Sequence, residues 1–288
     1  MAAQKITYGI IGYPLKSSLS PLMHNTAFKE LGVDAVYKIF SLKEEELKGF
    51  FTELKKKTSP IFGLNVTVPY KEKVIEYLDL LSPFARETMA VNTIVISPNR
   101  SLEGFNTDGP GFLAHLTELG FNPKGKRVAL LGAGGTARAI IAVLSLLPGR
   151  PESILVYNNH QDKAQSLVAD LKKRLDVSIV RSVDSVDDLN VETADLVINT
   201  TPLGIKKGDL CLIEEELLHS NMLVYDVIYD PAETPLLKMA RKKGAQVANG
   251  LGMLFFQGVL AFQHWAGVEL DGKIKSKMRQ SLSRGGEA

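Results

Sequence analysis

The chain has 288 residues, 45% of them apolar and 23% charged, and a formal net charge of +2 at pH 7. This is the composition of a globular protein of about two domains, and a charge so near zero does not favour nucleic acid or an anionic membrane as a partner. Cys211 is the only cysteine and the five histidines lack metal-ligand spacing, so we expect no internal disulfide and no metal site.

The beginning of the chain and its apolar runs predict a cytoplasmic protein. Residues 1–5 lack the apolar core of a signal peptide, and no apolar run approaches about 18 residues, the length that a membrane-spanning helix needs. We therefore expect a cytoplasmic location and no membrane contact.

Strand and helix patterns alternate along the chain, which predicts an α/β fold with mostly parallel sheets. In the first part, Ser20 followed by Pro21 predicts the N-cap and the first residue of a helix. A third predicted strand ends at Pro69, because proline cannot continue a sheet ladder. The strands expected here are 6–11, 35–40, 63–69, 91–96 and 102–106, and the helices are 20–31, 43–56, a segment through Leu80, and 83–89.

The second part repeats the alternation often enough to form one doubly wound sheet. Its expected strands are 126–131, 153–157, 178–180, 195–199, 223–227 and 246–248, with helices after Gly109, after the first of these strands, up to about Arg174, at 236–243 and at 253–265. The tail 281–288 is expected to be frayed. Because the final helix of chains with two α/β domains often packs back onto the first domain, we expect a discontinuous first domain, 1–107 with 252–288, in which substrate binding and catalysis would take place, and a Rossmann domain, 108–251.

A glycine-rich turn follows the strand 126–131 and opens an apolar helix, which is the context that a dinucleotide fingerprint requires. Gly132 would permit the tight turn, Gly134 would let the backbone approach a pyrophosphate, and Ala137 stands where a third glycine allows close helix packing. The N-terminus of the helix offers N–H groups and a positive dipole end to phosphates. The segment therefore predicts cofactor contacts from Gly132, Ala133, Gly134, Gly135, Thr136 and Ala137.

Two ionisable residues follow predicted strands in the first part. Lys71 comes just after the strand that ends at Pro69, and Asp108 follows the strand 102–106. Since ligands of open α/β sheets bind at the carboxyl ends of strands, the pair could move a proton to or from a carbonyl oxygen, with the carboxylate keeping the ammonium charged. Spacing alone leaves open the alternative that Lys71 is solvated and Asp108 is a helix N-cap.

Hydroxyl and amide side chains near the same strand ends suit a polyhydroxylated or carboxylate substrate. They are Ser18, Ser20, Asn65, Thr67 and Asn92. Ser20 already has a structural explanation as a helix cap and Asn92 has one as a turn residue, whereas Ser18 has no obvious structural task.

Over nearly its full length the chain resembles the shikimate dehydrogenase family. The resemblance rests on motifs that occur in the family's order, which makes the set far more specific than any one of them. They are GYP at 12–14 with SLSP at 18–21, NVTVPYK at 65–71, AVNT at 90–93, NTDG at 106–109, GAGG at 132–135, NTTP at 199–202, and GLGM at 250–253 with Gln257.

The resemblance implies NADP-linked, reversible reduction of 3-dehydroshikimate to shikimate, a step of chorismate and aromatic amino acid biosynthesis. Lys71 is then the principal acid/base, and Asp108 orients it and bonds the same hydroxyl. Substrate contacts are implied at Ser18, Ser20 and Tyr229 for the carboxylate, and at Asn65, Thr67, Asn92, Asp108 and Gln257 for the ring hydroxyls. Further cofactor contacts are implied at Asn158, Asn159, Lys163, Thr200, Thr201, Pro202, Val227, Gly250 and Met253.

The chain departs from the family pattern at the end of the second Rossmann strand. Where the family commonly has Asn-Arg-Thr, with the arginine on the 2′-phosphate of NADP, this chain has Asn158-Asn159-His160. Loss of a bidentate guanidinium should weaken phosphate recognition, yet no acidic residue stands there to hold the ribose diol of NAD. Lys163 and Arg138 are the candidate replacements, so we expect NADP as the cofactor and leave NAD use open.

Two alternatives remain at this point. Some members of the family also oxidise quinate and often carry threonine for one serine, so Ser18 and Ser20 favour shikimate over a quinate/shikimate dehydrogenase with relaxed cofactor use. A non-catalytic nucleotide-sensing module would be indicated by loss of Lys71 or Asp108, and both are present. We expect a monomer or homodimer that acts on a small-molecule substrate.

Overall fold

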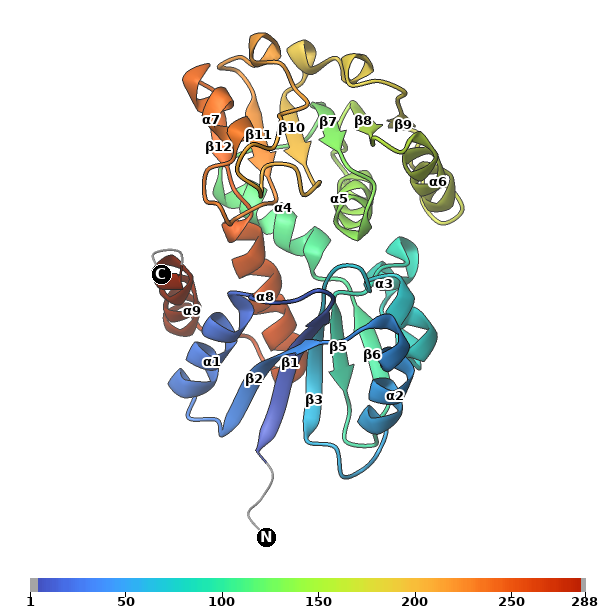
Figure 1. Cartoon of the computed structure of the whole chain (residues 1–288), viewed down its shortest axis with the longest axis vertical. Coiled ribbons are helices and arrows are strands. Elements are labelled where there is room, and N and C mark those ends of the chain that lie inside the picture. The colour runs from blue at the N-terminus through green and yellow to red at the C-terminus, as the bar shows by residue number, and fades with distance from the viewer. Residues whose placement is uncertain (1–4, 286–288) are drawn as a thin grey trace. The chain divides into compact units, whose positions relative to one another are not determined.

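The computed structural model describes residues 5–285 of the chain. The chain divides into two compact units, with boundaries between Gly111 and Phe112 and between Met253 and Leu254. The first unit is therefore built from both ends of the chain and the second from its middle, as the colours in Figure 1 show. The boundaries expected from the sequence, after 107 and after 251, fall a few residues earlier.

The first unit contains a mixed six-stranded sheet in the order β2-β1-β3-β5-β6-β4. Strand β1 is parallel to β2 and β3, and β4 is parallel to β6, whereas β5 is antiparallel to both of its neighbours. The strands are β1 (Ile6–Gly12), β2 (Ala35–Ser41), β3 (Ile61–Val66), β4 (Leu80–Leu81), β5 (Thr93–Ile96) and β6 (Leu102–Phe105). The helices are α1 (Ser20–Glu30), α2 (Glu44–Leu54), the 3-10 helix η1 (Lys73–Tyr77), α3 (Pro83–Thr88), the start of α4 (Asp108–Glu118), most of α8 (Leu251–Ala266), and α9 (Gly272–Gly285).

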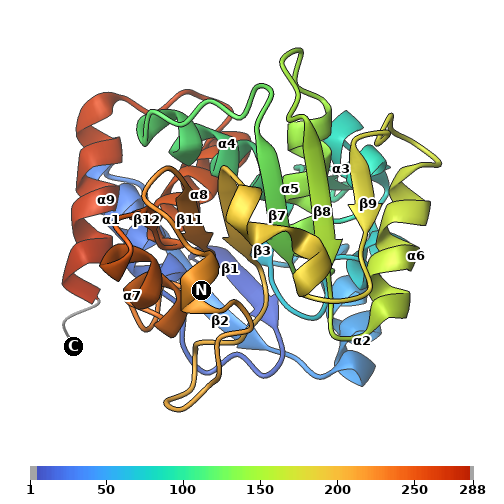
Figure 2. The same ribbon diagram turned by 90° about the horizontal axis from the view of Figure 1, so that it is seen from above.

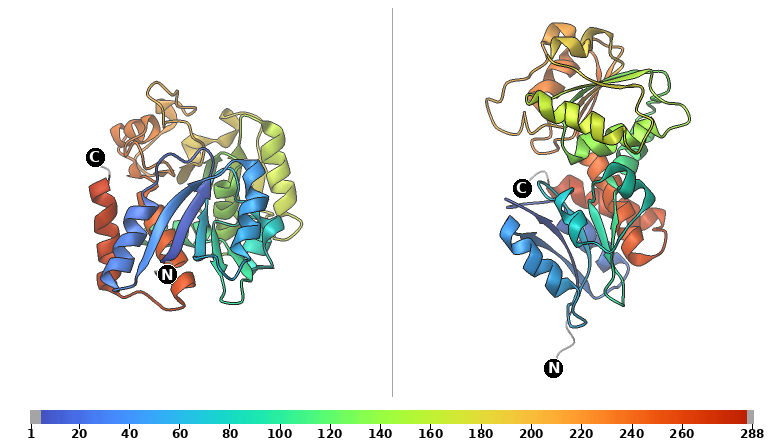
Figure 3. Two further views of the ribbon diagram at one scale, coloured as in Figure 1. Left: turned by 60° about the horizontal axis from the view of Figure 1, so that its bottom comes forward. Right: turned by 90° about the vertical axis from the view of Figure 1, so that its right-hand side faces the viewer.

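Helices cover both faces of this sheet (Figure 3). On one face, Phe51 of α2 and Leu64 of β3 belong to the same cluster of buried side chains. On the other face, Phe262 and Trp265 of α8 pack against the ring of His24 on α1. The central strands are accordingly apolar on both sides, as a sheet covered on both faces requires.

The second unit contains a six-stranded sheet in which all neighbouring strands are parallel, in the order β12-β11-β10-β7-β8-β9. Figure 2 shows most of these strands side by side. Counted in chain order from the β9 edge, the arrangement is 3-2-1-4-5-6, that of a doubly wound dinucleotide-binding sheet. The predicted fold, an α/β chain with a mostly parallel first sheet and a doubly wound second one, is confirmed.

The elements of the second unit follow the expected alternation. Its strands are β7 (Arg127–Leu131), β8 (Ser153–Tyr157), β9 (Val180–Ser182), β10 (Leu196–Asn199), β11 (Leu223–Asp226) and β12 (Gln246–Ala248). Its complete α-helices are α5 (Gly135–Ser145), α6 (Gln161–Leu171) and α7 (Pro235–Lys242), and the 3-10 helices η2 (Asp187–Leu189), η3 (Val191–Thr193) and η4 (Glu215–Leu217) lie in the connections.

The segment before Leu80 is not the α-helix that the sequence predicts. It forms only the short helix η1, after which β4 pairs with β6. The Asp79 amide donates to the carbonyl of Leu102 (2.9 Å), and the Asp79 carboxylate accepts from the Leu102 amide (2.9 Å). These long-range bonds hold the segment at the edge of the sheet, and local sequence preference does not reveal them.

The prediction that Ser20 is the N-cap of α1 is wrong. The cap position is Leu19, which has no side-chain cap bond, and Ser20 is already helical. The amide of Ser20 instead donates to the hydroxyl oxygen of Ser18 (3.1 Å). The Ser18 hydroxyl therefore accepts from the first amide of α1, because a serine oxygen can accept from the amide two residues further on.

The C-terminal segment is better ordered than the sequence predicts. Helix α9 packs along α1, with Met278 and Leu282 almost completely buried and Ser281 also buried. Together with Ile274 these residues follow the spacing of one helix face. The expectation of a frayed tail is therefore wrong for 281–285, and 286–288 lie outside the described residues.

His24 is a buried histidine in the core of the first unit. Its ring is fully buried and stacks on that of Tyr37, with the ring centroids 4.6 Å apart. Burial lowers the pKa of His24 from 6.5 to about 3, although the nearby Asn65 amide opposes this shift. The imidazole is therefore neutral in the folded protein at pH 7.

We predict that His24 makes folding stability depend on pH between about 6 and 4. The unfolded chain binds a proton at His24 in this range and the folded chain does not, so the free energy of unfolding should fall by about 1.4 kcal/mol per pH unit on acidification. Urea denaturation of the wild type and of His24→Phe at several pH values isolates this contribution as the pH dependence of their difference. A difference that stays constant with pH would contradict the prediction.

Candidate functional site

Lys71 and Asp108 meet in the first unit. Lys71 follows the turn after β3, in which the Tyr70 amide donates to the carbonyl of Thr67 (3.0 Å), and Asp108 begins α4 just after β6. The Lys71 Nζ lies 2.6 Å from Asp108 Oδ2, and the two side chains are only 15% and 8% exposed. Two opposite charges so close and so little exposed to water interact strongly.

The carboxylate of Asp108 does not cap its own helix. The amides of Asp108 and Gly109 donate to Oδ1 of Asn106, at 3.0 and 3.4 Å, so the side chain of Asn106 caps the first amides of α4. This leaves the Asp108 carboxylate for side chains from other elements, and the N-cap alternative for Asp108 is wrong.

Asn92 holds the second oxygen of this carboxylate. Its Nδ2 donates to Asp108 Oδ1 (2.8 Å) and to Thr107 Oγ1 (2.9 Å), and its Oδ1 accepts from the Thr107 amide (2.7 Å). Gln257 Oε1 lies 3.4 Å from the same Nδ2. Asp108 is therefore fixed at both oxygens, by Lys71 on one side and by Asn92 on the other.

Asn65 belongs to a second, adjoining set of buried hydrogen bonds. Its Nδ2 donates to the carbonyl of Asn92 (3.1 Å) and to Thr93 Oγ1 (3.2 Å), and its Oδ1 accepts from the hydroxyl of Tyr37 (2.7 Å). Burial raises the pKa of the Tyr37 phenol, which therefore remains a donor. With both amide protons engaged, Asn65 has its remaining hydrogen-bonding capacity at Oδ1.

The structure thus brings together most of the residues that the sequence indicated for this unit. Asn65, Asn92, Gln257, Asp108 and Lys71 form one connected polar set, and Ser20 is buried at the start of α1. Ser18 and Thr67 are half-buried in the adjoining loops. Tyr229 belongs to the second unit. Tyr37, Thr93 and Thr107 were not predicted, because β-strand alternation alone does not tell which face of a strand meets the site.

Close backbone contacts hold together the segments that carry this site. The Val91 amide donates to the carbonyl of Lys71 (2.7 Å), which ties the turn after β3 to the segment before β5. A Cβ at Gly111 would lie 2.7 Å from the backbone nitrogen of Gln257, so glycine permits α4 and α8 to touch here.

The glycine turn of the second unit has the geometry that a dinucleotide needs. Gly132 has φ +108°, and a Cβ there would lie 2.3 Å from Thr200 Oγ1, so only glycine fits. A Cβ at Gly134, the N-cap of α5, would meet nothing within 4 Å, and the first turn of α5 carries no acidic side chain. Open space and the backbone amides at a helix N-terminus fit a pyrophosphate group.

The loop after β10 touches this turn, and the loop after β11 touches the segment at Gly250. Thr200 donates to the carbonyl of Leu131 through its amide (2.8 Å) and its hydroxyl (2.7 Å). A Cβ at Gly250 would lie 1.9 Å from the carbonyl oxygen of Val227, so these two backbones are in contact. The predicted cofactor residues Thr200, Val227 and Gly250 therefore belong to closely packed backbone segments, and buried Ala137 packs α5 onto the sheet.

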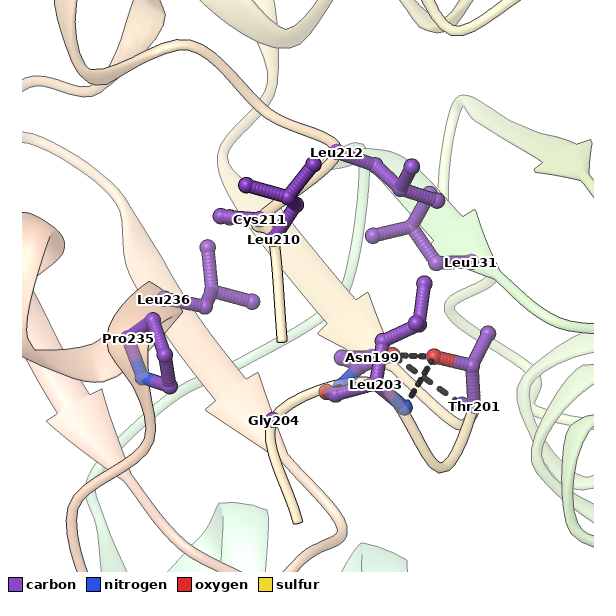
Figure 4. Close-up of a pocket in the computed structure, with 10 residues that line it drawn as sticks. All are labelled: Leu131, Asn199, Thr201, Leu203, Gly204, Leu210, Cys211, Leu212, Pro235 and Leu236. Atoms are coloured by element: carbon purple, nitrogen blue, oxygen red, sulfur yellow. Dashed lines mark hydrogen bonds between the residues drawn. The ribbon is translucent and has the colours of Figure 1, made fainter. Parts of the chain in front are cut away.

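A small pocket lies behind the loop after β10 (Figure 4). It is lined mainly by apolar side chains, among them Leu131, Leu203 and Cys211. Its volume of about 10 Å³ admits at most one water molecule. Burial raises the pKa of the Cys211 thiol. The pocket is too small to be the substrate or cofactor site.

The candidates for binding the 2′-phosphate differ in their surroundings. The buried Arg138 has its Nη1 2.5 Å from Asp170 Oδ2, and Arg174 pairs with the same carboxylate at 3.0 Å. Burial opposes ionisation of Asp170, but the two arginines hold its pKa below the ordinary value. Lys163, in the first turn of α6, is exposed and makes no ion pair within the described part of the chain. Lys163 is thus better placed to bind an external phosphate than Arg138.

Near the end of β8 the two asparagines also differ. Asn158 is half-buried and donates to the carbonyl of His160 (3.0 Å), whereas Asn159 is exposed.

Across residues 5–285 no helix is long and apolar enough to span a membrane. The same residues contain no group of three or more His, Cys, Asp or Glu side chains arranged to hold a metal ion.

Comparisons with known proteins agree on one family. The model of the shikimate dehydrogenase substrate binding domain matches residues 10–94. A shikimate dehydrogenase (NADP(+)) of Carboxydothermus hydrogenoformans is 42% identical over 273 residues, which cover 93% of this chain and 94% of the relative.

Solved structures resemble the chain over almost its whole length. Shikimate 5-dehydrogenase of Thermus thermophilus in complex with NADP(H) and shikimate has a TM-score of 0.82 and 33% identity, covering 97% of this chain and 99% of its own. Shikimate 5-dehydrogenase of Listeria monocytogenes in complex with shikimate and NAD has a TM-score of 0.85 and 32% identity, covering 98% of each chain.

We predict that Arg138 stabilises the second unit and does not bind cofactor. Arg138→Met should lower the free energy of unfolding by about 2 kcal/mol, the worth of a hydrogen bond to a charged group, and leave dinucleotide affinity unchanged. Arg174→Met, which leaves the shorter Arg138–Asp170 pair intact, is the matched control and should cost less. Urea denaturation and calorimetric titration measure both quantities, and weaker dinucleotide binding by a stable Arg138→Met variant would refute the prediction.

Proposed function

Because the chain belongs to the shikimate dehydrogenase family and is an NADP-dependent oxidoreductase of the shikimate pathway, we propose that Lys71 and Asp108 perform the proton transfer of its reaction. The reaction is the reversible reduction of 3-dehydroshikimate to shikimate. The observation that carries the proposal is the ion pair of 2.6 Å between two poorly exposed side chains, with Asn92 bound to the other carboxylate oxygen.

Reduction of the ring ketone adds a hydride to the carbonyl carbon and a proton to its oxygen. NADPH, when bound, supplies the hydride. Lys71 donates the proton from Nζ to the carbonyl oxygen, and in the oxidation direction the neutral amine takes the hydroxyl proton back. The Asp108 carboxylate holds Nζ in position through their 2.6 Å contact, and its own position is held by Asn92.

Substrate binding follows the polar set around this pair. The hydroxyls of Ser18 and Ser20, at the N-terminus of α1, are suited to a carboxylate, and the helix dipole favours an anion there. Asn65 would accept a hydrogen bond from a substrate hydroxyl at Oδ1, because both of its N–H groups already donate to other residues. Thr67 and Gln257 would complete the contacts to the ring hydroxyls, and Tyr229 stays the contact proposed for the substrate carboxylate.

Cofactor binding would use the glycine turn and the loops after β8, β10 and β11. The contacts proposed are those named above, Gly132 to Ala137, Asn158, Asn159, Thr200, Thr201, Pro202, Val227, Gly250 and Met253. Lys163 is the cation proposed for the 2′-phosphate, in place of the family's arginine. The presence of NAD in the Listeria relative keeps NAD use by this chain a question for experiment.

Ser18 and Ser20 together favour shikimate over quinate, and the intact Lys71–Asp108 pair argues against a non-catalytic sensor. A cytoplasmic location and a monomer or homodimer remain predictions from the sequence.

We predict that Lys71→Ala lowers kcat by a factor of about 10² to 10⁴, the usual contribution of a general acid, with little change in shikimate affinity. Lys73→Ala is the matched control, since Lys73 lies two residues away and pairs with the exposed Glu44. Initial rates at the reduced-nicotinamide absorbance band measure both variants. Wild-type rates for Lys71→Ala, or an equal loss for Lys73→Ala, would contradict the assignment.

We predict that Lys163→Ala raises the Kd of NADP+ about fivefold, equivalent to about 1 kcal/mol, and leaves that of NAD+ unchanged. The reason is that only NADP+ carries the phosphate that an exposed lysine would contact. Lys172→Ala, at the other end of α6, is the control for charge alone. An equal change in the Kd of NADP+ and of NAD+, or no change in either, would show that Lys163 does not bind the 2′-phosphate.

A further inference from the structure

We propose that Asp226 is a positioning residue for the nicotinamide cofactor, because its buried carboxylate fixes the two loops that follow β10 and β11. The proposal rests on the proposed function, in which Thr200, Thr201 and Val227 of these loops contact the cofactor. Neither the sequence motifs nor the fold alone assigns this carboxylate a task.

Asp226 is the last residue of β11 and is completely buried. Its Oδ1 accepts from Asn199 Nδ2 and from the Ile228 amide, both at 3.1 Å, and its Oδ2 accepts from Thr234 Oγ1 at 2.7 Å. It makes no ion pair with any residue between 5 and 285. A carboxylate with three donors and no cation is an expensive group to bury, since an apolar side chain would avoid its desolvation.

One arm of this cluster, made of Asn199, Asp226 and Thr234, shapes the loop after β10. Besides donating to Asp226, Asn199 donates to the Leu203 carbonyl (3.1 Å), and its Oδ1 accepts from the amide (3.0 Å) and hydroxyl (2.7 Å) of Thr201. Figure 4 shows the Asn199 and Thr201 side chains turned toward one another. Between them, Thr200 is bonded to the Leu131 carbonyl and touches the glycine turn. The cluster thus reaches the backbone of the glycine turn through one loop.

The other arm closes the loop after β11. The Val227 amide donates to the Asn199 carbonyl (3.0 Å), and the Ile228 carbonyl accepts from the Gly250 amide (3.0 Å). Thr234 is almost completely buried and is the N-cap of α7, where its oxygen accepts from the Leu237 amide (3.4 Å). One carboxylate therefore sets where the residues after β11 leave the sheet and where they rejoin a helix.

All three partners of Asp226 donate to it, so its charge and acceptor character matter as well as its shape. Burial raises the pKa of Asp226, and the three donors act against this shift. Asparagine is nearly isosteric but would point an NH₂ group at one of these donors, leaving a buried donor without an acceptor. Asp226→Asn should therefore loosen the loops while preserving the volume of the side chain.

The test measures cofactor and substrate binding separately. For Asp226→Asn and Thr234→Val, we expect the Kd of NADP+, from calorimetric titration without turnover, to rise about tenfold or more while the KM of shikimate stays within about twofold. Thr234→Ser retains the hydroxyl donor and should restore near wild-type NADP+ affinity. A purely structural role would lower Tm and leave the Kd of NADP+ unchanged, and that result in a folded Asp226→Asn would overturn the proposal.

If Asp226→Asn does not fold, the comparison of Thr234→Val with Thr234→Ser tests the proposal. Equal NADP+ affinity of these two variants would overturn it. Thr201→Val separates this proposal from its premise. An unchanged Kd in Thr201→Val would contradict the proposed cofactor contacts themselves. A raised Kd in Thr201→Val with an unchanged Kd in Asp226→Asn would contradict only the role of Asp226.

Discussion

The ion pair between Lys71 and Asp108 is the interaction on which the rest of the first unit's site depends. Neither charge could remain so little exposed without the other, because an unpaired charge in this setting would be strongly destabilising. The surrounding structure keeps the pair together. Asn106 takes over the capping of α4, Asn92 bonds the second carboxylate oxygen, and the turn after β3 delivers Lys71. If Lys71 is the proton donor, as proposed, a side chain held in this way needs little reorganisation when substrate binds.

The two units use a similar device with different outcomes. In each, an asparagine beside one strand bonds a carboxylate at or just after the end of another. Asn92, just before β5, bonds Asp108, and Asn199, the last residue of β10, bonds Asp226. Asp108 also has a lysine partner that is 15% exposed, so the pair can reach a substrate. Asp226 has only neutral donors and is completely buried, so it can act only through the loops that it holds. Access to solvent and a cationic partner therefore separate a residue suited to chemistry from one suited to positioning.

The sequence predicted most of the fold because it depends on local patterns, and it proposed site residues of the first unit that the structure brings together. The glycine turn, the alternating elements and the Lys71–Asp108 pair are all visible as short motifs beside strands. What could not be predicted depends on contacts between distant segments. Leu80–Leu81 form a strand only because they pair with β6, and the Tyr37 hydroxyl meets Asn65 only once β2 has joined the sheet. The apolar residues of helix α9 have the spacing of one helix face, but the helix was not predicted because most of its residues are polar.

The most direct test of the account is a double-mutant cycle on Lys71 and Asp108, measured as kcat for shikimate oxidation with NADP+. If Asp108 acts mainly by holding Lys71, the double variant Lys71→Ala/Asp108→Ala should be no slower than Lys71→Ala alone, within about twofold, because residues that act as a unit are not additive. If instead the two losses multiply, each side chain contributes on its own, and the ion pair is not the constraint that organises the chemistry.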